Sequence, residues 1–162
     1  MSSLAGKTVL VTGASKGIGA ATAHAVIKAG ARLIAHYGND RAGAEQATSF
    51  ARDGQVTLLK AEFSDIEAVD AFWSQALKAA GGYIDVLVNN AGIMHQTGGI
   101  EDPIEDWDTA WSHSMAVNVH APARLLRHAV GSWLTAEKTG SIISIGSWVT
   151  TRGTSNPGAI AY

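Results

Sequence analysis

Short apolar segments of strand length alternate with amphipathic segments of helix length along most of the chain. This alternation constrains the fold more than any other feature, because successive parallel strands need a crossover connection that usually contains a helix. The expected strands cover residues 8–12, 31–37, 56–60, 85–89 and 141–145. The expected helices cover residues 18–29, 42–52, 65–80, 103–111 and 119–134. The pattern predicts a single α/β domain over residues 1–162, built on a doubly wound parallel sheet.

Local signals mark where some of these elements begin and end. Gly30 follows the first helix, at a position where glycine can adopt the left-handed conformation that ends a helix. Ser64 and Glu67 stand three residues apart before the third helix, a spacing that predicts a capping box. Residues 146–161 are rich in Gly, Ser and Thr, and we expect them to form a loop.

Charge and cysteine content narrow the range of partners and of chemistry. The 162 residues carry a formal net charge of −2 and no run of five like charges, so we expect neither nucleic acid nor a membrane as a partner. Cysteine is absent, which excludes disulfides, thiolate metal sites and a cysteine nucleophile. The early apolar stretches are too short for a signal or a span, which predicts a cytoplasmic protein. We expect surface or hydrogen-bonded core positions, not metal ligation, for the six scattered histidines: His24, His36, His95, His113, His120 and His128.

A glycine-rich turn follows the first expected strand and leads directly into a helix. Its spacing is G-x-x-x-G-x-G, and the residues we expect to contact a cofactor are Gly13, Ser15, Lys16, Gly17, Ile18 and Gly19. Glycine lets the backbone approach a pyrophosphate closely, and the amides and dipole of the helix stabilise its charge. The turn predicts a dinucleotide site, with a turn that binds no ligand as the alternative. The same letters match the G-x-S-x-G elbow of α/β-hydrolases, but that fold needs several strands before the elbow and only twelve residues precede Gly13.

Residues 12–19 resemble the cofactor loop of the short-chain dehydrogenases/reductases, and three further segments match this family in the same order. The first of them, Asn89, Asn90, Ala91 and Gly92, follows the fourth strand. In the family this tetrapeptide stabilises the central sheet and lines the adenosine side of the cofactor. The resemblance extends over essentially the whole chain and is closest to 3-oxoacyl-carrier-protein reductase-like members. It implies a Rossmann-type sheet in the order 3-2-1-4-5, of which this chain is the N-terminal part.

The resemblance also implies a catalytic set. Asn118, at the start of the 119–134 helix, matches the catalytic asparagine, although by itself it would be a helix cap. Ser147 matches the serine that binds the substrate carbonyl, and Ser144 is a weaker candidate for the same role. Tyr162 matches the tyrosine that exchanges a proton with the substrate oxygen.

The expected activity of the intact enzyme is hydride transfer between a nicotinamide cofactor and a carbonyl or secondary alcohol substrate. The family's lysine, four residues beyond the tyrosine, has no counterpart in a sequence that stops at Tyr162. We therefore expect the chain as given to have little or no turnover. The alternative is a truncated dinucleotide-binding or interaction module, which needs no such lysine.

The end of the second strand bears on the choice of nicotinamide cofactor. Tyr37 stands where an acidic residue would bind the ribose hydroxyl of NAD, and Asn39 follows close by. Lys16 and Arg41 can supply positive charge to a 2′-phosphate. The sequence thus favours NADP(H) over NAD(H), while the nearby Asp40 leaves NAD(H) open.

Three further expectations follow from the resemblance and from the helical pattern. Glu62 and Phe63 follow the third strand, where the family usually has an aspartate that contacts adenine, so the resemblance implies that they lie at the cofactor. Glu62 either reaches adenine with its longer side chain or is only a surface charge. We also expect a homo-oligomer formed through the 119–134 helix, because its residues Leu125, Leu126 and Val130 should be partly uncovered. The strand at 141–145 should likewise be left as an open edge.

Overall fold

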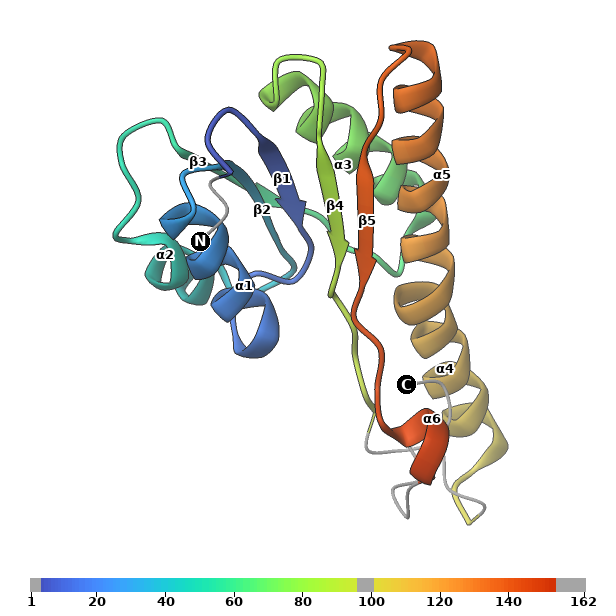
Figure 1. Ribbon diagram of the computed structural model, residues 1–162. Coiled ribbons are helices and arrows are strands. Elements are labelled where there is room, and N and C mark those ends of the chain that lie inside the picture. The colour runs from blue at the N-terminus through green and yellow to red at the C-terminus, as the bar shows by residue number, and fades with distance from the viewer. Residues whose placement is uncertain (1–3, 96–100, 154–162) are drawn as a thin grey trace.

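The computed structural model describes residues 4–95 and 101–153. Five parallel strands form one sheet in the order β3-β2-β1-β4-β5, which confirms the predicted topology (Figure 1). The strands are β1 (Thr8–Val11), β2 (Arg32–Tyr37), β3 (Val56–Lys60), β4 (Val86–Asn89) and β5 (Ser141–Ser144). The chain leaves β1 toward β2 on one side and later enters β4 on the other side. The crevice at the carboxyl ends of β1 and β4 is therefore the topological switch point, where doubly wound sheets bind ligands.

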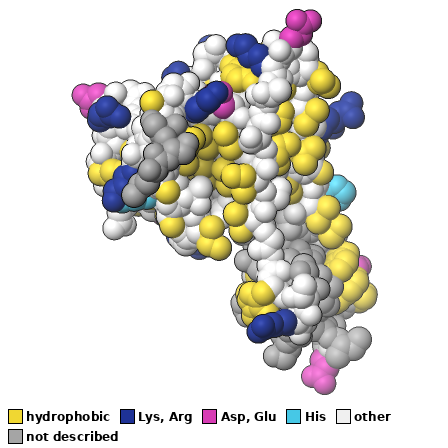
Figure 2. All heavy atoms as spheres, in the orientation of Figure 1, with side chains coloured by type: hydrophobic (Ala, Val, Ile, Leu, Met, Phe, Trp, Pro, Cys, Tyr) yellow, Lys and Arg dark blue, Asp and Glu magenta, His cyan; other side chains and the backbone are white. Residues whose placement is uncertain are grey.

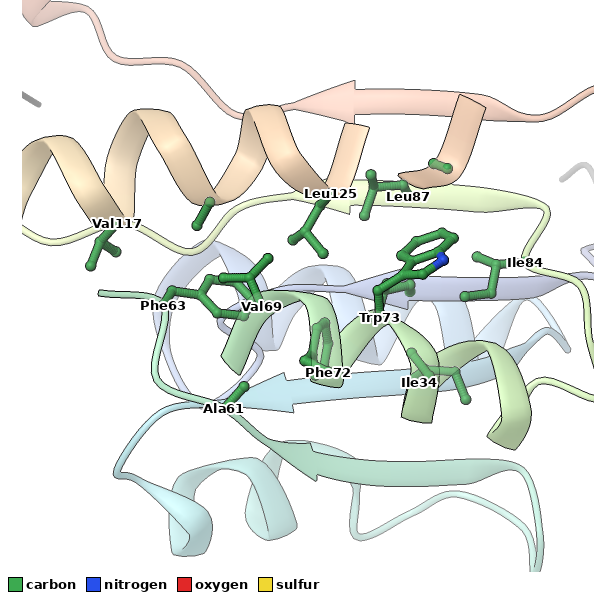
Figure 3. Packing of buried hydrophobic residues seen from close by; sticks show 14 of the residues in the cluster. Ile34, Ala61, Phe63, Val69, Phe72, Trp73, Ile84, Leu87, Val117 and Leu125 are labelled. Atoms are coloured by element: carbon green, nitrogen blue, oxygen red, sulfur yellow. The ribbon is translucent and has the colours of Figure 1, made fainter. Parts of the chain in front are cut away.

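The sheet is covered by helices on both faces, because successive side chains of a strand point to opposite sides. Val9 and Val11 pack on the face covered by α1, whereas Leu10 belongs to the core shared with α3 and α5. Figure 3 shows this second core, into which side chains from α3, β4 and α5 point. The helical elements are α1 (Gly17–Lys28), α2 (Arg41–Thr48), α3 (Ile66–Ala79), α4 (Ile104–Met115), the π-helical segment η1 (Ala116–His120), α5 (Ala121–Thr135) and α6 (Val149–Arg152).

Several predicted boundaries are wrong. The helix predicted over 42–52 already ends at Thr48, and the predicted loop over 146–161 contains the short helix α6. The capping box is not formed, because the side chain of Asp65 caps α3 instead by accepting a hydrogen bond from the amide of Glu67. Ser64 lies one residue outside the cap and donates its hydroxyl to Glu62. The glycine at the end of α1 behaves as predicted, with Gly30 at φ +85°.

The helices predicted over 103–111 and 119–134 are one continuous helix from 104 to 135, interrupted by η1 (Figure 1). We attribute the π-helical segment to Pro122, which follows it by two residues. Proline has no amide to donate to the carbonyl of Asn118 four residues earlier, and its ring would collide with that carbonyl in a regular α-helix. The wider turn of η1 removes the collision. Asn118 therefore lies within a helix and is not an N-cap, contrary to that reading of the sequence.

The apolar stripe of α5 divides into two faces. One face is buried against α3 and the sheet: Ala121, Leu125, Ala129 and Trp133. The other is exposed, with Leu126 41%, Val130 37% and Leu134 75% accessible, and Val119 of η1 is 44% accessible. The expectation that Leu125 is partly uncovered is thus wrong, since it is fully buried, whereas Leu126 and Val130 are exposed as expected. Within the described residues, none of the helices has the length and apolar character needed to cross a membrane.

His36 is a buried polar side chain in β2 and is hydrogen-bonded at both ring nitrogens. Nδ1 accepts from the amide of Gly13 at 3.0 Å, and Nε2 lies 3.1 Å from the carbonyl oxygen of Ala61. The imidazole stacks on Phe63 with a centroid distance of 3.9 Å and meets the edge of Phe72. Burial lowers the pKa of His36 to about 4, against the weaker opposing effects of the Ala61 carbonyl and the Glu62 charge. His36 is the hydrogen-bonded core histidine that the sequence allowed for.

Leu125 and Leu126 offer a test of the division between the two faces of α5. Replacing Leu125 with alanine should lower the free energy of unfolding by about 2–5 kcal/mol, because it removes buried methyl groups and leaves a cavity. The neighbouring Leu126→Ala should change it by about 0.5 kcal/mol or less. Equilibrium unfolding in urea measures both. Equal effects of the two substitutions would contradict the assigned packing of α5.

His36 makes the stability of the fold dependent on pH. The unfolded histidine binds a proton below its ordinary pKa of 6.5, whereas the folded one stays neutral down to about 4. Its contribution is therefore complete above pH 6.5 and is lost as the pH falls toward 4, at about 1.4 kcal/mol per pH unit and ~3 kcal/mol in total. The free energy of unfolding measured between pH 7 and 4 should fall more steeply for the wild type than for His36→Asn. Parallel curves would contradict a neutral, buried His36.

Candidate functional site

The turn after β1 and the turn after β4 meet at the switch point of the sheet. Thr12, buried at the end of β1, accepts hydrogen bonds at its hydroxyl oxygen from the amides of Asn90 and Ala91, both at 2.9 Å. The side-chain amide of Asn90 donates in return to the carbonyl oxygens of Thr12 at 2.9 Å and Gly13 at 3.1 Å. Six polar groups of the two turns thus satisfy one another across the two strands. The structure brings the glycine turn and the Asn-Asn-Ala-Gly segment together at the expected edge.

Each of the three glycines of the turn occupies its position for a different structural reason. Gly13 adopts φ +67°, and a Cβ there would lie 2.9 Å from the Cα of Ala91. Gly19 has no unusual φ, but a Cβ at this position would collide with the carbonyl oxygen of Gly13. Gly17 adopts φ +57° with no atom within 4 Å of a built Cβ. Gly13 and Gly19 therefore let the turn, α1 and the β4 segment pack closely, whereas Gly17 lies at the open side where a ligand could approach.

Lys16 and Ile18 lie on that open side. Lys16 occupies the N-cap position of α1, is exposed and makes no capping hydrogen bond. Among the described residues, no ion pair or hydrogen bond involves its ammonium group. A cation at a helix N-terminus opposes the helix dipole, so it lowers stability slightly unless an anion binds there. Ile18 is 60% exposed although it is a large apolar residue.

Ser15 differs from these two residues in its surroundings. Its hydroxyl donates to the carbonyl oxygen of Asp40 at 2.8 Å, which ties the turn to the start of α2. The carboxylate of Asp40 in turn accepts from the amide of Gly43 at 2.8 Å and caps α2. Asp40 is therefore engaged in local structure at both its main chain and its side chain.

The residues predicted to decide the cofactor take different positions at the end of β2. Tyr37 is only 7% exposed, so most of its side chain cannot contact a ligand. Asn39 is exposed in the bend that follows. Arg41 forms an ion pair with Glu45 one turn later in α2, at 2.7 Å. Lys16, unlike Arg41, has no ion pair with any residue that the structure describes.

Glu62 and Phe63 lie after β3, as predicted, but face different surroundings. Glu62 is exposed, and its carboxylate accepts hydrogen bonds from the amide and hydroxyl of Ser64. Phe63 is 5% exposed, and its ring belongs to the core against His36 and Phe72. A ligand at this edge could reach the exposed Glu62 side chain, whereas the aromatic ring of Phe63 points into the core (Figure 3).

Asn118 and Asn89 lie on either side of the contact between β4 and the long helix. Asn118 accepts from the amide of Ile93 through Oδ1 and donates to the carbonyl of Ile93 through Nδ2, both at 2.8 Å. This reciprocal pair anchors the segment after Gly92 to η1. Asn89 is 7% exposed and donates weakly to Pro122 at 3.4 Å, while its Oδ1 is buried without a hydrogen-bond partner among the described residues.

Sequence reasoning did not find His36 as a neighbour of the site. The residue was grouped with the other histidines, and no motif marks a histidine in a strand as a partner of a glycine turn. The signal was its place in the sequence, since the side chain at the carboxyl end of β2 lies beside the turn that follows the adjacent strand β1.

The last two predicted catalytic residues lie beyond β5. Ser147 is half-buried, three residues after the strand, and its hydroxyl oxygen accepts from the amide of Val149 at 3.3 Å. Ser144, the weaker candidate, is an exposed residue of β5 itself and pairs in register with Asn89. Tyr162 lies outside the described residues. Its catalytic role, like that of Ser147, stays a prediction.

Comparisons with known proteins agree with this arrangement. A family model described as short chain dehydrogenase matches residues 7–162. The 3beta-hydroxysteroid dehydrogenase 1 of Eggerthella lenta is 34% identical over 146 residues, which are 89% of this chain and 54% of that protein. The 3-oxoacyl-(acyl-carrier-protein) reductase of Synechocystis sp. is 32% identical over 164 residues, which cover 100% of this chain and 63% of that protein. The chain thus spans between half and two thirds of the length of these curated relatives.

Solved structures show the same relationship in three dimensions. A metagenomic short-chain oxidoreductase in complex with NADP matches with a TM-score of 0.78 and 34% identity over 98% of this chain and 70% of that one. The landomycin C-6 ketoreductase with bound NADP and rabelomycin matches with a TM-score of 0.78 and 31% identity over 98% and 64%. Together with the glycine turn, the Asn-Asn-Ala-Gly segment and the 3-2-1-4-5 sheet, these matches show that the chain belongs to the short chain dehydrogenase family.

Proposed function

We propose that this chain provides the nucleotide-binding part of an NADP(H)-dependent oxidoreductase that interconverts a carbonyl compound and a secondary alcohol. The observation that carries the proposal is the interlocked pair of turns after β1 and β4, which leaves Lys16, Gly17 and the first amides of α1 facing the switch point. Membership of the short chain dehydrogenase family and two similar structures with bound NADP support it.

The described residues fit the phosphates of a dinucleotide. The first amides of an α-helix have no partner within the helix and can donate to an anion. Gly17 has open space where a side chain would otherwise stand, and Lys16 adds a positive charge beside it. The exposed Ile18 provides an apolar surface next to these polar groups. We place the phosphates at the N-terminus of α1 and the adenosine toward Glu62 and the Asn90–Gly92 segment.

In the proposed reaction the bound nicotinamide supplies or accepts the hydride. Tyr162 exchanges a proton with the substrate oxygen, and Ser147 donates a hydrogen bond to the same oxygen. Asn118 contributes by holding the segment that follows Gly92 through its two hydrogen bonds to Ile93. These assignments rest on the match of each residue to the family's motifs.

NADP(H) is the preferred cofactor in this proposal, for two reasons of charge. Lys16 is a cation without a partner among the described residues and can pair with a 2′-phosphate. The acidic residue nearest to the end of β2, Asp40, already caps α2 and receives the Ser15 hydroxyl at its carbonyl. It is therefore poorly placed to bind the ribose hydroxyl of NAD(H).

A cytoplasmic location completes the proposal and agrees with the absence of cysteine.

Self-association through α5 is also part of the proposal. Three large apolar side chains of this helix are exposed, Leu126, Val130 and Leu134, and Val119 of the adjoining η1 is exposed as well. In Figure 2 hydrophobic side chains are visible along the surface where Figure 1 places α5. Several large apolar side chains exposed along one helix are typical of an interface with another chain.

Lys16→Ala tests the nucleotide site and its preference. The substitution should weaken binding of NADP+ by about tenfold to a hundredfold, because it removes a charge-assisted hydrogen bond of about 1.5–3 kcal/mol to the 2′-phosphate, and should weaken NAD+ binding less, because NAD+ offers Lys16 only the pyrophosphate. Lys28→Ala is the matched control, since Lys28 is an exposed lysine at the other end of α1. Titration calorimetry measures both nucleotides. No heat with either nucleotide at millimolar concentration would overturn the proposed function, and equal loss of both would overturn the preference alone.

Leu126→Asp tests the association. If α5 forms the interface, sedimentation should show the wild type as a dimer or larger and the variant as a monomer, because a carboxylate cannot be buried unpaired at an apolar contact. Phe50→Asp is the control, a replacement of a residue of similar exposure, 42%, that contacts His24 of α1. A monomeric wild type, or equal effects of the two substitutions, would rule out an interface at α5.

A further inference from the structure

The ring of His36 is the only side chain described here that hydrogen-bonds to the amide of Gly13. An amide can only donate and a carbonyl oxygen can only accept, so the two contacts leave one tautomer. Nδ1 must be unprotonated toward Gly13, and Nε2 must carry the hydrogen toward Ala61. The backbone carbonyl of His36 also accepts from the amide of Ala14 at 2.8 Å. One residue of β2 therefore binds two consecutive amides of the glycine turn.

These two hydrogen bonds decide which amides of the turn remain for a ligand. The amides of Gly13 and Ala14 point toward β2 and are satisfied there. The first amides of an α-helix, here those at the start of α1, have no partner within the helix. With Gly13 and Ala14 bound to β2, these later amides are the ones left for a ligand.

The position of the ring is itself tightly constrained. Phe63 stacks on one side of it with the planes within 4° of each other, and Phe72 meets it edge-on. The Nε2 contact to Ala61 fixes the rotation of the ring about the Cβ–Cγ bond. Because Ala61 and Phe63 belong to the segment after β3, His36 joins the turn proposed for the phosphates to the segment proposed for adenine.

We propose that His36 is a positioning residue of the nucleotide site, whose unprotonated Nδ1 holds the Gly13 amide and so presets the turn in the conformation that binds the cofactor phosphates. The inference rests on the proposed nucleotide-binding function. Without this hydrogen bond the turn samples other conformations, and the free energy of ordering the turn then lowers the affinity for the cofactor.

Two amide substitutions separate this role from a general contribution to stability. In His36→Asn the side-chain oxygen lies close to the position of Nδ1 and can accept from Gly13, but it cannot reach Ala61. In His36→Gln the side-chain nitrogen can donate to Ala61, but the acceptor for Gly13 is lost. Both variants lose the stacked ring equally. Calorimetric titration with NADP+ should show affinity within about threefold of the wild type for His36→Asn and about tenfold weaker for His36→Gln.

Thermal unfolding of the same samples provides the comparison with stability. If affinity follows the melting temperature rather than the presence of an acceptor toward Gly13, His36 has only a structural role and the inference is wrong. The inference is also wrong if both variants bind NADP+ as tightly as the wild type. If the wild type itself fails to bind any nicotinamide nucleotide, the proposed function fails first, and the two failures are thereby distinguished.

A measurement on the wild type keeps the inference testable if the variants do not fold. Nitrogen NMR of protein labelled with ¹⁵N-histidine distinguishes a protonated from an unprotonated ring nitrogen. We expect an unprotonated Nδ1 and a protonated Nε2 in His36, both before and after addition of NADP+. A His36 ring protonated at Nδ1 would overturn the inference, because such a nitrogen cannot accept from the Gly13 amide.

Discussion

The hydrogen bonds between Thr12 and the Asn90–Ala91 segment are the contact on which the rest of the candidate site depends. They join the turn after β1 to the turn after β4 across the point where the strand order reverses. The contact is possible because Gly13 and Gly19 carry no Cβ. A Cβ at Gly13 would meet the backbone of Ala91, and a Cβ at Gly19 would meet the carbonyl oxygen of Gly13. Close packing and polar satisfaction are thus achieved by the same few residues, and they leave the outer side of the turn, at Lys16 and Gly17, for an anion.

A second constraint comes from the long helix behind the sheet. Pro122 cannot donate to the carbonyl of Asn118, and the helix widens into η1 directly before it. The side chain of Asn118 then binds both polar backbone groups of Ile93. On the opposite side, α5 packs on α3 through Leu125 while Arg124 forms two hydrogen bonds with Asp70. The hydrogen bonds from Arg124 and from His128 hold the pKa of the Asp70 carboxyl well below its usual range. The helix therefore connects the segment after β4 to the core of the domain.

Much of the fold could be predicted from local patterns, and the errors have identifiable physical causes. The strands could be predicted because buried parallel strands are continuous apolar runs. The end of α1 could be predicted because glycine readily adopts the left-handed conformation that Gly30 has there. The capping box failed because Asp65, one residue closer to α3, supplies the cap with a shorter reach. The gap expected between the helices at 103–111 and 119–134 is wrong because the chain continues from α4 to α5 without leaving the helix, through the π-helical segment η1.

The sequence by itself determined the order of the elements, the glycine turn and the identity of the residues that meet at the switch point. Those features depend on periodicity, on residue size and on backbone conformations that are local to a few residues. Only the tertiary structure decided that Asn118 binds Ile93, that Leu125 is buried while Leu126 is exposed, and that His36 holds the amide of Gly13. Each of these is a contact between elements distant in the chain or a choice between two faces of one helix. Such contacts depend on how the helices and strands pack together, which no local pattern contains.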